Sequence, residues 1–113
     1  MSYSNNISYK TRALEAFVTK KFKQWMENRK SITPDMWYGK FSDRYHSGYP
    51  DFIACEMGGM VCYELKAQGK KLTKLQAHIA RQLVRAGAKY YIVSWDGEAL
   101  SLTDFMEYEG GKK

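Results

Sequence analysis

The segment "GYPDFIACEMGGMVCYELKAQGK", residues 48–70, places two carboxylates and a lysine in runs that otherwise have the composition of buried strands. "DFIACEM" and "MVCYELK" are strand-like, and the dipeptide Gly58-Gly59 joins them. Because two glycines supply the positive φ values of a two-residue primed turn, we predict a tight hairpin here. Unpaired charges are costly to bury, so Asp51, Glu64 and Lys66 each need a counter-charge, an ion or a ligand.

In that hairpin, Asp51 would lie opposite Lys66, and Ile53 would lie opposite Glu64. Side chains alternate between the two faces of a strand, so all four would share one face. Asp51 and Glu64 would then be diagonal neighbours, about 7–8 Å apart at the backbone. A divalent cation such as Mg²⁺ could lie between the two carboxylates, whereas an ion pair with Lys66 is the purely structural alternative.

The two cysteines favour a reducing compartment. The predicted register places Cys55 opposite Cys62, but no other ligand pair has metal-binding spacing, so we expect free, buried thiols. No apolar run approaches the ~20 residues of a membrane span, and no signal-peptide core is present. We therefore expect a cytoplasmic protein of a bacterium or a phage-infected cell.

The rest of the chain predicts a layered α/β domain with a mixed sheet. Apolar residues recur at helical spacing in two segments, and short runs rich in β-branched and aromatic residues lie between turn formers. The predicted elements are a helix over 8–29, strands over 36–41, 51–57 and 60–66, a helix over 72–87, a strand over 89–95 and a closing helix over 101–108. We expect residues 1–113 to form one domain, with a flexible tail from about residue 110.

Positive charge is concentrated in part of the chain. The net charge is +6, and residues 66–89 carry seven Lys or Arg and no acid, whereas residues 96–109 carry five acids and no base. This distribution fits either a solvated helix surface or a patch that binds a polyanion, with nucleic acid as the first candidate. The candidate phosphate contacts in this basic segment are Lys70, Lys71, Lys74, Arg81 and Arg85. Lys40 and Arg44, which precede the hairpin, are two further candidates.

Gln76 falls within the apolar stripe of the second predicted helix, on the side that faces the sheet. A buried amide needs a hydrogen-bond partner, which the acidic pair could supply. Thr73-x-x-Gln76 also fits a capping box, in which the glutamine bonds back to the backbone of Thr73. The sequence leaves both interpretations open.

The ordered set "GYPD", "ELK" and "LTKLQ", with thirteen residues from Asp51 to Glu64, resembles the PD-(D/E)XK nuclease superfamily. It is most similar to the virus-type replication-repair nuclease (VRR-NUC) domain, which has G-x-P-D, E-x-K and a downstream glutamine in a basic helix. The resemblance covers most of the chain. It implies a single restriction-endonuclease-like domain with an αβββαβ core and a mixed sheet flanked by helices.

The resemblance also implies a metal site. Asp51, Glu64 and the backbone carbonyl of Leu65 would bind Mg²⁺ or Mn²⁺. Glu15 would correspond to an acid on the first helix that completes the metal shell, often through water. Such an ion activates water and polarises a phosphate, which is the chemistry that phosphodiester hydrolysis requires.

By the same resemblance, Lys66 would orient the attacking water or stabilise charge on the phosphate, and Gln76 would position the water or Lys66. The leading hypothesis is a metal-dependent, structure-selective endonuclease that cuts branched or Holliday-junction-like DNA as a homodimer. Segment 37–49, or the first helix with Phe17 and Trp25, would supply the dimer interface. The alternatives are a flap nuclease or nickase that acts with a partner protein, and a nuclease-like module that binds DNA without cutting it.

Overall fold

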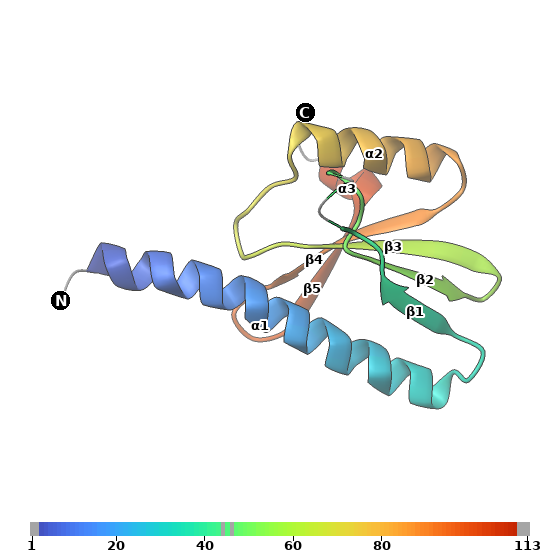
Figure 1. Cartoon of the computed structure of the whole chain (residues 1–113), viewed down its shortest axis with the longest axis horizontal. Helices are drawn as coiled ribbons and strands as arrows, with labels where there is room; N and C mark the ends of the chain where they lie inside the picture. The colour runs from blue at the N-terminus through green and yellow to red at the C-terminus, as the bar shows by residue number, and fades with distance from the viewer. Residues whose placement is uncertain (1–2, 44, 46, 111–113) are drawn as a thin grey trace.

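A computed structural model describes residues 3–43, 45 and 47–110, and the side chains among them from Glu15 onward. This part of the chain forms three helices and five strands (Figure 1). In chain order they are α1 (Tyr3–Ile32), β1 (Trp37–Lys40), β2 (Phe52–Glu56), β3 (Gly59–Leu65), α2 (Lys74–Arg85), β4 (Lys89–Trp95), β5 (Leu100–Asp104) and α3 (Phe105–Gly110). None of the described helices is long and apolar enough to cross a membrane.

The five strands form one mixed sheet in the order β1-β2-β3-β4-β5. Neighbouring strands are antiparallel except β3 and β4, which are parallel and are connected through α2. Parallel neighbours require such a crossover, because the chain must return to the end of the sheet where β3 began before β4 can start. The predicted α/β class and mixed sheet are confirmed.

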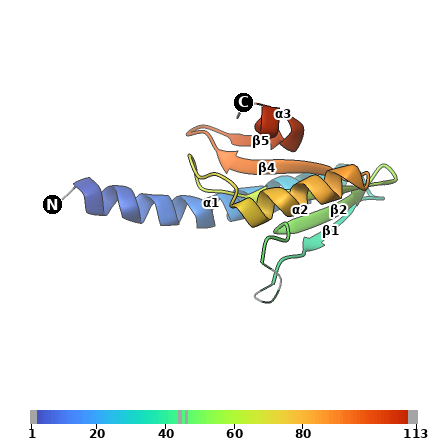
Figure 2. The same cartoon turned by 90° about the horizontal axis from the view of Figure 1, so that it is seen from above.

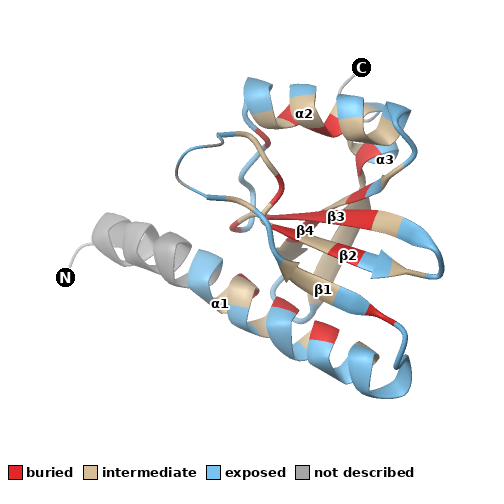
Figure 3. Cartoon of the chain, turned by 45° about the vertical axis from the view of Figure 1, so that its right-hand side comes forward, coloured by how far each residue is buried: buried red, intermediate tan, exposed pale blue. Residues whose placement is uncertain are grey.

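Helices cover both faces of the sheet: α1 lies on one face, and α2 and α3 lie on the other (Figures 1 and 2). On the α1 face, Phe22 and Tyr63 belong to one buried cluster, and on the opposite face Cys62, Tyr90 and Phe105 belong to another. β3 contributes to both clusters and is the most continuously buried strand (Figure 3). A charged side chain in β3 is therefore removed from water.

Several element bounds follow the prediction. β4 occupies 89–95 as expected, and α2 is shorter than 72–87 because Thr73 caps its N-terminus. α1 extends past 8–29 at both ends and stops shortly before Pro34, which cannot continue a helix. The predicted tail begins where α3 ends, at Gly110, and residues 111–113 lie outside the described residues.

The predicted closing helix over 101–108 is wrong in its first half. β5 occupies that position and pairs with β4, and α3 starts only at Phe105. The Asp104 carboxylate accepts a hydrogen bond from the Met106 amide at 2.8 Å, which marks the change from strand to helix. A segment this short fits both periodicities, so pairing with β4 decides between them.

The β2–β3 hairpin turns one residue earlier than predicted. Met57 and Gly58 occupy the turn with φ values of 53° and 77°, and Gly59 already belongs to β3. Two successive positive φ values define a type I′ turn, whose twist matches that of the flanking strands. Glu56 consequently faces Gly59.

The resulting register differs from the predicted one by two residues, so each side chain stays on its predicted face while its facing partner changes. Continued by one pair, the observed register places Asp51 opposite Glu64 instead of diagonal to it. Cys55 faces Met60, not Cys62. Only Cys62 is buried, so the expectation of two opposed, buried thiols is wrong.

Candidate active site

Asp51 lies at the entrance of β2, where the preceding loop and β3 hold it. Its Oδ1 accepts a hydrogen bond from the Ser42 hydroxyl at 3.2 Å, and its Oδ2 accepts one from the Leu65 amide at 2.9 Å. Its backbone carbonyl also accepts the Phe41 amide at 2.8 Å. These bonds fix the carboxylate against the end of β3, next to Glu64.

Glu64 is the charged side chain that the described fold buries, with 3% of its surface exposed. Its Oε2 accepts a hydrogen bond from the Gln76 amide at 3.3 Å, whereas Oε1 has no partner among the described residues. Burial, reinforced by the nearby charge of Asp51, raises the pKa of Glu64 to about 9. Without a cation beside it, this carboxyl is therefore protonated at neutral pH.

Gln76 combines the two roles that the sequence left open. Its side-chain oxygen accepts the Thr73 amide at 2.9 Å, and its backbone amide donates to the Thr73 hydroxyl at 3.1 Å, which completes a capping box. The same side chain uses its NH₂ group to bind Glu64. The N-terminus of α2 and the acidic pair are thus linked by one amide.

Lys66 follows β3 directly, and its backbone amide donates to the Val93 carbonyl at 2.8 Å. Its side chain is half-buried, and within the described part of the chain it forms no ion pair with either acid. Its charge nevertheless lowers the pKa of Glu64, against the larger effects that raise it. The ion-pair alternative is therefore not what satisfies the two carboxylates in this structure.

Glu15 of α1 lies across a small cavity from Asp51. The cavity has a volume of about 180 Å³ and is lined by Glu15, Thr19, Lys23, Lys40, Ser42, Asp51, Phe52 and Leu65. Glu15 is exposed, and among the described residues no three His, Cys, Asp or Glu side chains gather closely enough to hold a metal ion. Direct protein ligation would then come from the Asp51 and Glu64 side chains, with any role of Glu15 passing through water.

The acidic pair fits a hard divalent cation. Glu64 Oε1 is buried with no partner in the part of the chain that is described, and each Asp51 oxygen accepts one hydrogen bond and keeps a free lone pair. Carboxylate, carbonyl and water oxygens are the ligands that Mg²⁺ and Mn²⁺ prefer. A cation here would offset both the repulsion between the acids and the cost of burying Glu64.

The basic residues that were predicted to contact DNA differ in whether their charges are exposed and unpaired. Lys40, Lys70, Lys71, Lys74 and Arg85 are exposed. Arg81 forms an ion pair with Glu109 of α3, so part of its charge is used within the chain. Arg44 lies outside the described residues.

Sequence reasoning missed Ser42 and Tyr90 as neighbours of the acids. Ser42 donates to Asp51, and its position between turn formers gave no signal for this contact. Tyr90 is buried in β4, and the charge of Glu64 contributes to the rise of its pKa, after burial itself. Only the long-range pairing of β3 with β4 brings Tyr90 to the site.

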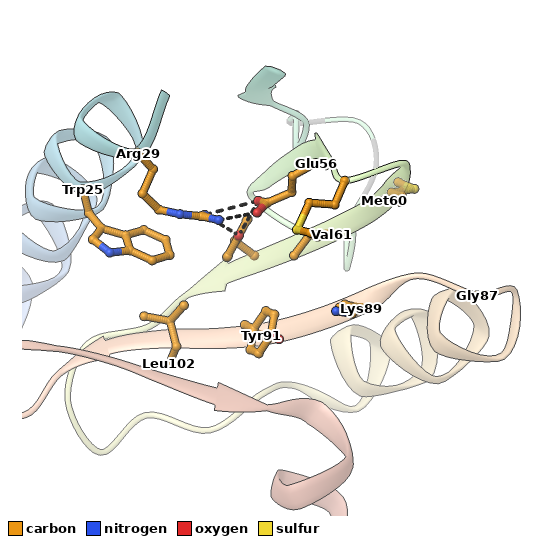
Figure 4. A pocket seen from close by; sticks show the side chains of 12 residues that line it. Trp25, Arg29, Glu56, Met60, Val61, Gly87, Lys89, Tyr91 and Leu102 are labelled. Atoms are coloured by element: carbon orange, nitrogen blue, oxygen red, sulfur yellow. Dashed lines mark hydrogen bonds and ion pairs between the residues drawn. The ribbon is translucent and has the colours of Figure 1, made fainter. Parts of the chain in front are cut away.

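A second cavity, of about 480 Å³, lies at the hairpin end of the sheet (Figure 4). Arg29 of α1 forms an ion pair with Glu56 there, and the Tyr63 hydroxyl donates to Glu56 at 3.0 Å. Trp25 and Tyr91 also line it. None of the residues predicted to bind metal or DNA, or to act in catalysis, lines this larger cavity, so cavity size and the sequence motifs point to different places.

No protein-family model and no curated protein sequence matches the chain. Among solved structures, it is similar to Hjc, a Holliday junction resolvase from the hyperthermophilic archaeon Archaeoglobus fulgidus. The TM-score is 0.58 at 14% sequence identity, and the match covers 78% of this chain and 77% of the resolvase. The chain shares the fold of this resolvase. The predicted restriction-endonuclease-like architecture is thereby confirmed.

Proposed function

We propose that the protein is a metal-dependent, structure-selective endonuclease that hydrolyses phosphodiester bonds in branched DNA such as a four-way junction. The proposal rests on the adjacent acids Asp51 and Glu64, one of which has a buried oxygen without a partner among the described residues. A fold shared with a Holliday junction resolvase supports it. The P-D, E-x-K and downstream glutamine motifs support a kinship with VRR-NUC domains in particular.

In this proposal, Asp51, Glu64 and the Leu65 carbonyl hold Mg²⁺ or Mn²⁺. The ion would supply an activated water and a positive charge on the phosphate. Gln76 fixes one oxygen of Glu64, so that the other is directed to the ion. Lys66, which forms no ion pair with the described residues, is available to stabilise the negative charge that develops on the phosphoryl oxygens.

A panel of labelled substrates tests the function. Four-way junction, flap, linear duplex and single-stranded DNA would be incubated with the protein in Mg²⁺, in Mn²⁺ and in EDTA. We expect metal-dependent cleavage that is fastest on the junction. Preference for the flap would favour the flap-nuclease alternative, and binding without cleavage of any substrate would contradict a nuclease.

The exposed lysines before and at the start of α2 are expected to contact phosphates. Neutralising Lys70, Lys71 and Lys74 together with glutamine should flatten the plot of log binding constant against log salt concentration by about one unit per lysine. Lys89→Gln is the matched control, because Lys89 is also exposed but pairs with Val61 near the hairpin end of the sheet. An unchanged slope in the triple variant would remove this segment from the DNA footprint.

Symmetric cutting of a junction requires two active sites, which a two-fold homodimer supplies. Trp37 and Phe41 are 54% and 39% exposed on and beside the edge strand β1, which favours segment 37–49 as the interface. The first-helix candidates are less exposed: Phe17 and Trp25 are half-buried, with Phe17 packed edge-on against Trp95 at 4.9 Å and Trp25 packed edge-on against Tyr63.

We expect sedimentation at micromolar concentration to show a dimer, and Trp37→Glu to convert it to monomer. Met106→Glu is the control, since Met106 is exposed to a similar extent on α3. Wild-type protein that stays monomeric with and without junction DNA would contradict the resolvase-like arrangement and favour a nickase that acts with a partner protein.

A further inference from the structure

Tyr90 lies beside Glu64 on the neighbouring strand. In the parallel pairing of β3 with β4, Cys62 pairs with Tyr90 and Glu64 pairs with Ile92. Partners in a ladder share a face, and residues two apart on one strand do so as well, so Tyr90 and Glu64 are on the same face of the sheet. This is the face covered by α2 and α3.

The Tyr90 side chain is 1% exposed, and Phe105 of α3 packs edge-on against its ring at 5.6 Å. Two buried side-chain atoms in the described part of the chain have no hydrogen-bond partner: the Tyr90 hydroxyl oxygen and Glu64 Oε1. Leaving a buried polar atom unsatisfied costs about 1–3 kcal/mol, and a phenylalanine at position 90 would avoid that cost. A buried hydroxyl at this position therefore needs a polar partner, and the Glu64 carboxyl is close enough to interact with it.

The two unsatisfied atoms complement each other chemically. A tyrosine hydroxyl can donate one hydrogen bond, and a carboxylate oxygen can accept two, so Oε1 can bind both a cation and the hydroxyl. Gln76 already holds the other oxygen of Glu64, from α2. A donor on β4 would complete the support of this carboxylate.

We propose that Tyr90 is a positioning residue, whose hydroxyl donates a hydrogen bond to the Glu64 carboxylate when that carboxylate binds a divalent cation. This inference rests on the proposed function, because it assigns the cation to Asp51 and Glu64. Gln76 and Tyr90 then fix the ligand from α2 and from β4. Hydrogen bonds of this kind orient a metal ligand and typically contribute 10–100-fold to metal affinity.

The test compares Tyr90→Phe with wild type and with Tyr91→Phe. Tyr91 is the next residue on the same strand. Tyr91→Phe therefore also removes one tyrosine hydroxyl, but from the opposite face of the sheet, where Tyr91 lines the larger cavity. Mn²⁺ affinity would be measured by calorimetry, together with unfolding in urea without metal. We expect Tyr90→Phe to bind Mn²⁺ about 10–100-fold more weakly, with metal-free stability equal to or above wild type, and Tyr91→Phe to bind Mn²⁺ like wild type.

DNA cleavage gives a second readout. Loss of a positioning hydrogen bond should raise the Mn²⁺ concentration needed for half-maximal cleavage, and saturating Mn²⁺ should restore most of the rate. Wild-type Mn²⁺ affinity in Tyr90→Phe, or a loss of metal-free stability that matches its loss of affinity, would overturn the role of Tyr90 and leave the nuclease proposal intact. Failure of the wild-type protein to bind Mn²⁺ would overturn both.

Discussion

Asp51→Asn and Glu64→Gln are each expected to reduce cleavage of branched DNA by about a thousandfold or more, because each removes a charged ligand of the proposed metal ion, which would activate water and neutralise the phosphate. DNA binding should be unchanged or tighter in both variants, since a negative charge that repels the phosphate is lost. Cleavage with Mg²⁺ or Mn²⁺ and binding in EDTA measure the two effects separately.

Glu98→Gln is the matched control for these variants, since it removes one exposed negative charge in the turn between β4 and β5. It should cleave like wild type. Cleavage at the wild-type rate by either site variant would show that the acidic pair does not bind the catalytic metal.

Glu64→Gln is also expected to be more stable than wild type at pH 8 when no metal is present. The folded protein holds the Glu64 proton up to a pKa of about 9, above the ordinary value of 4.5, so it binds more protons than the unfolded chain between these two values. Wild-type stability should therefore fall as pH rises through this window, by up to about 1.4 kcal/mol per pH unit from this group. The glutamine variant lacks the penalty, and the difference between the two proteins should reach about 2–5 kcal/mol at pH 8 and vanish near pH 4.

Bound metal should make the wild-type protein more stable than Glu64→Gln, the reverse of the order expected without metal. A cation that binds only the folded wild type at 100 times its dissociation constant adds about 2.7 kcal/mol, whereas Glu64→Gln should gain little from it. Urea unfolding at several pH values, with Mn²⁺ and with EDTA, measures both effects. Parallel pH profiles for wild type and variant in EDTA would show that Glu64 is not held protonated by burial.

The shared face of the two acids could be predicted from the hairpin, but their facing partners could not. Both Gly58-Gly59 and Met57-Gly58 are plausible turns, and they differ by two residues in register, which leaves every side chain on the same face. The hydrophobic pattern therefore cannot choose between them. Met57 adopts a positive φ in the observed turn, which a non-glycine residue does at some cost, so the turn preferences of the residues alone do not predict this register.

Long-range pairing explains most of what the sequence did not reveal. β5 forms because its residues pair with β4, although the same short segment has helical spacing. Tyr90 reaches Glu64 only through the pairing of β3 with β4 across the intervening α2. Gln76 could be predicted because local sequence patterns indicate both of its contacts. Thr73 lies three residues before it, as in a capping box, and Gln76 falls within the apolar stripe of the helix that faces the sheet.

The most direct test of the proposed metal centre is an anomalous difference map from crystals soaked in Mn²⁺. We expect a peak between the Asp51 and Glu64 carboxylates, with the Leu65 carbonyl also in contact with the ion. Occupancy of that peak should be lost in Glu64→Gln crystals treated in the same way. A map of the wild-type protein with no peak between these two acids, while Mn²⁺ binds elsewhere on the chain, would contradict the metal centre and the nuclease chemistry built on it.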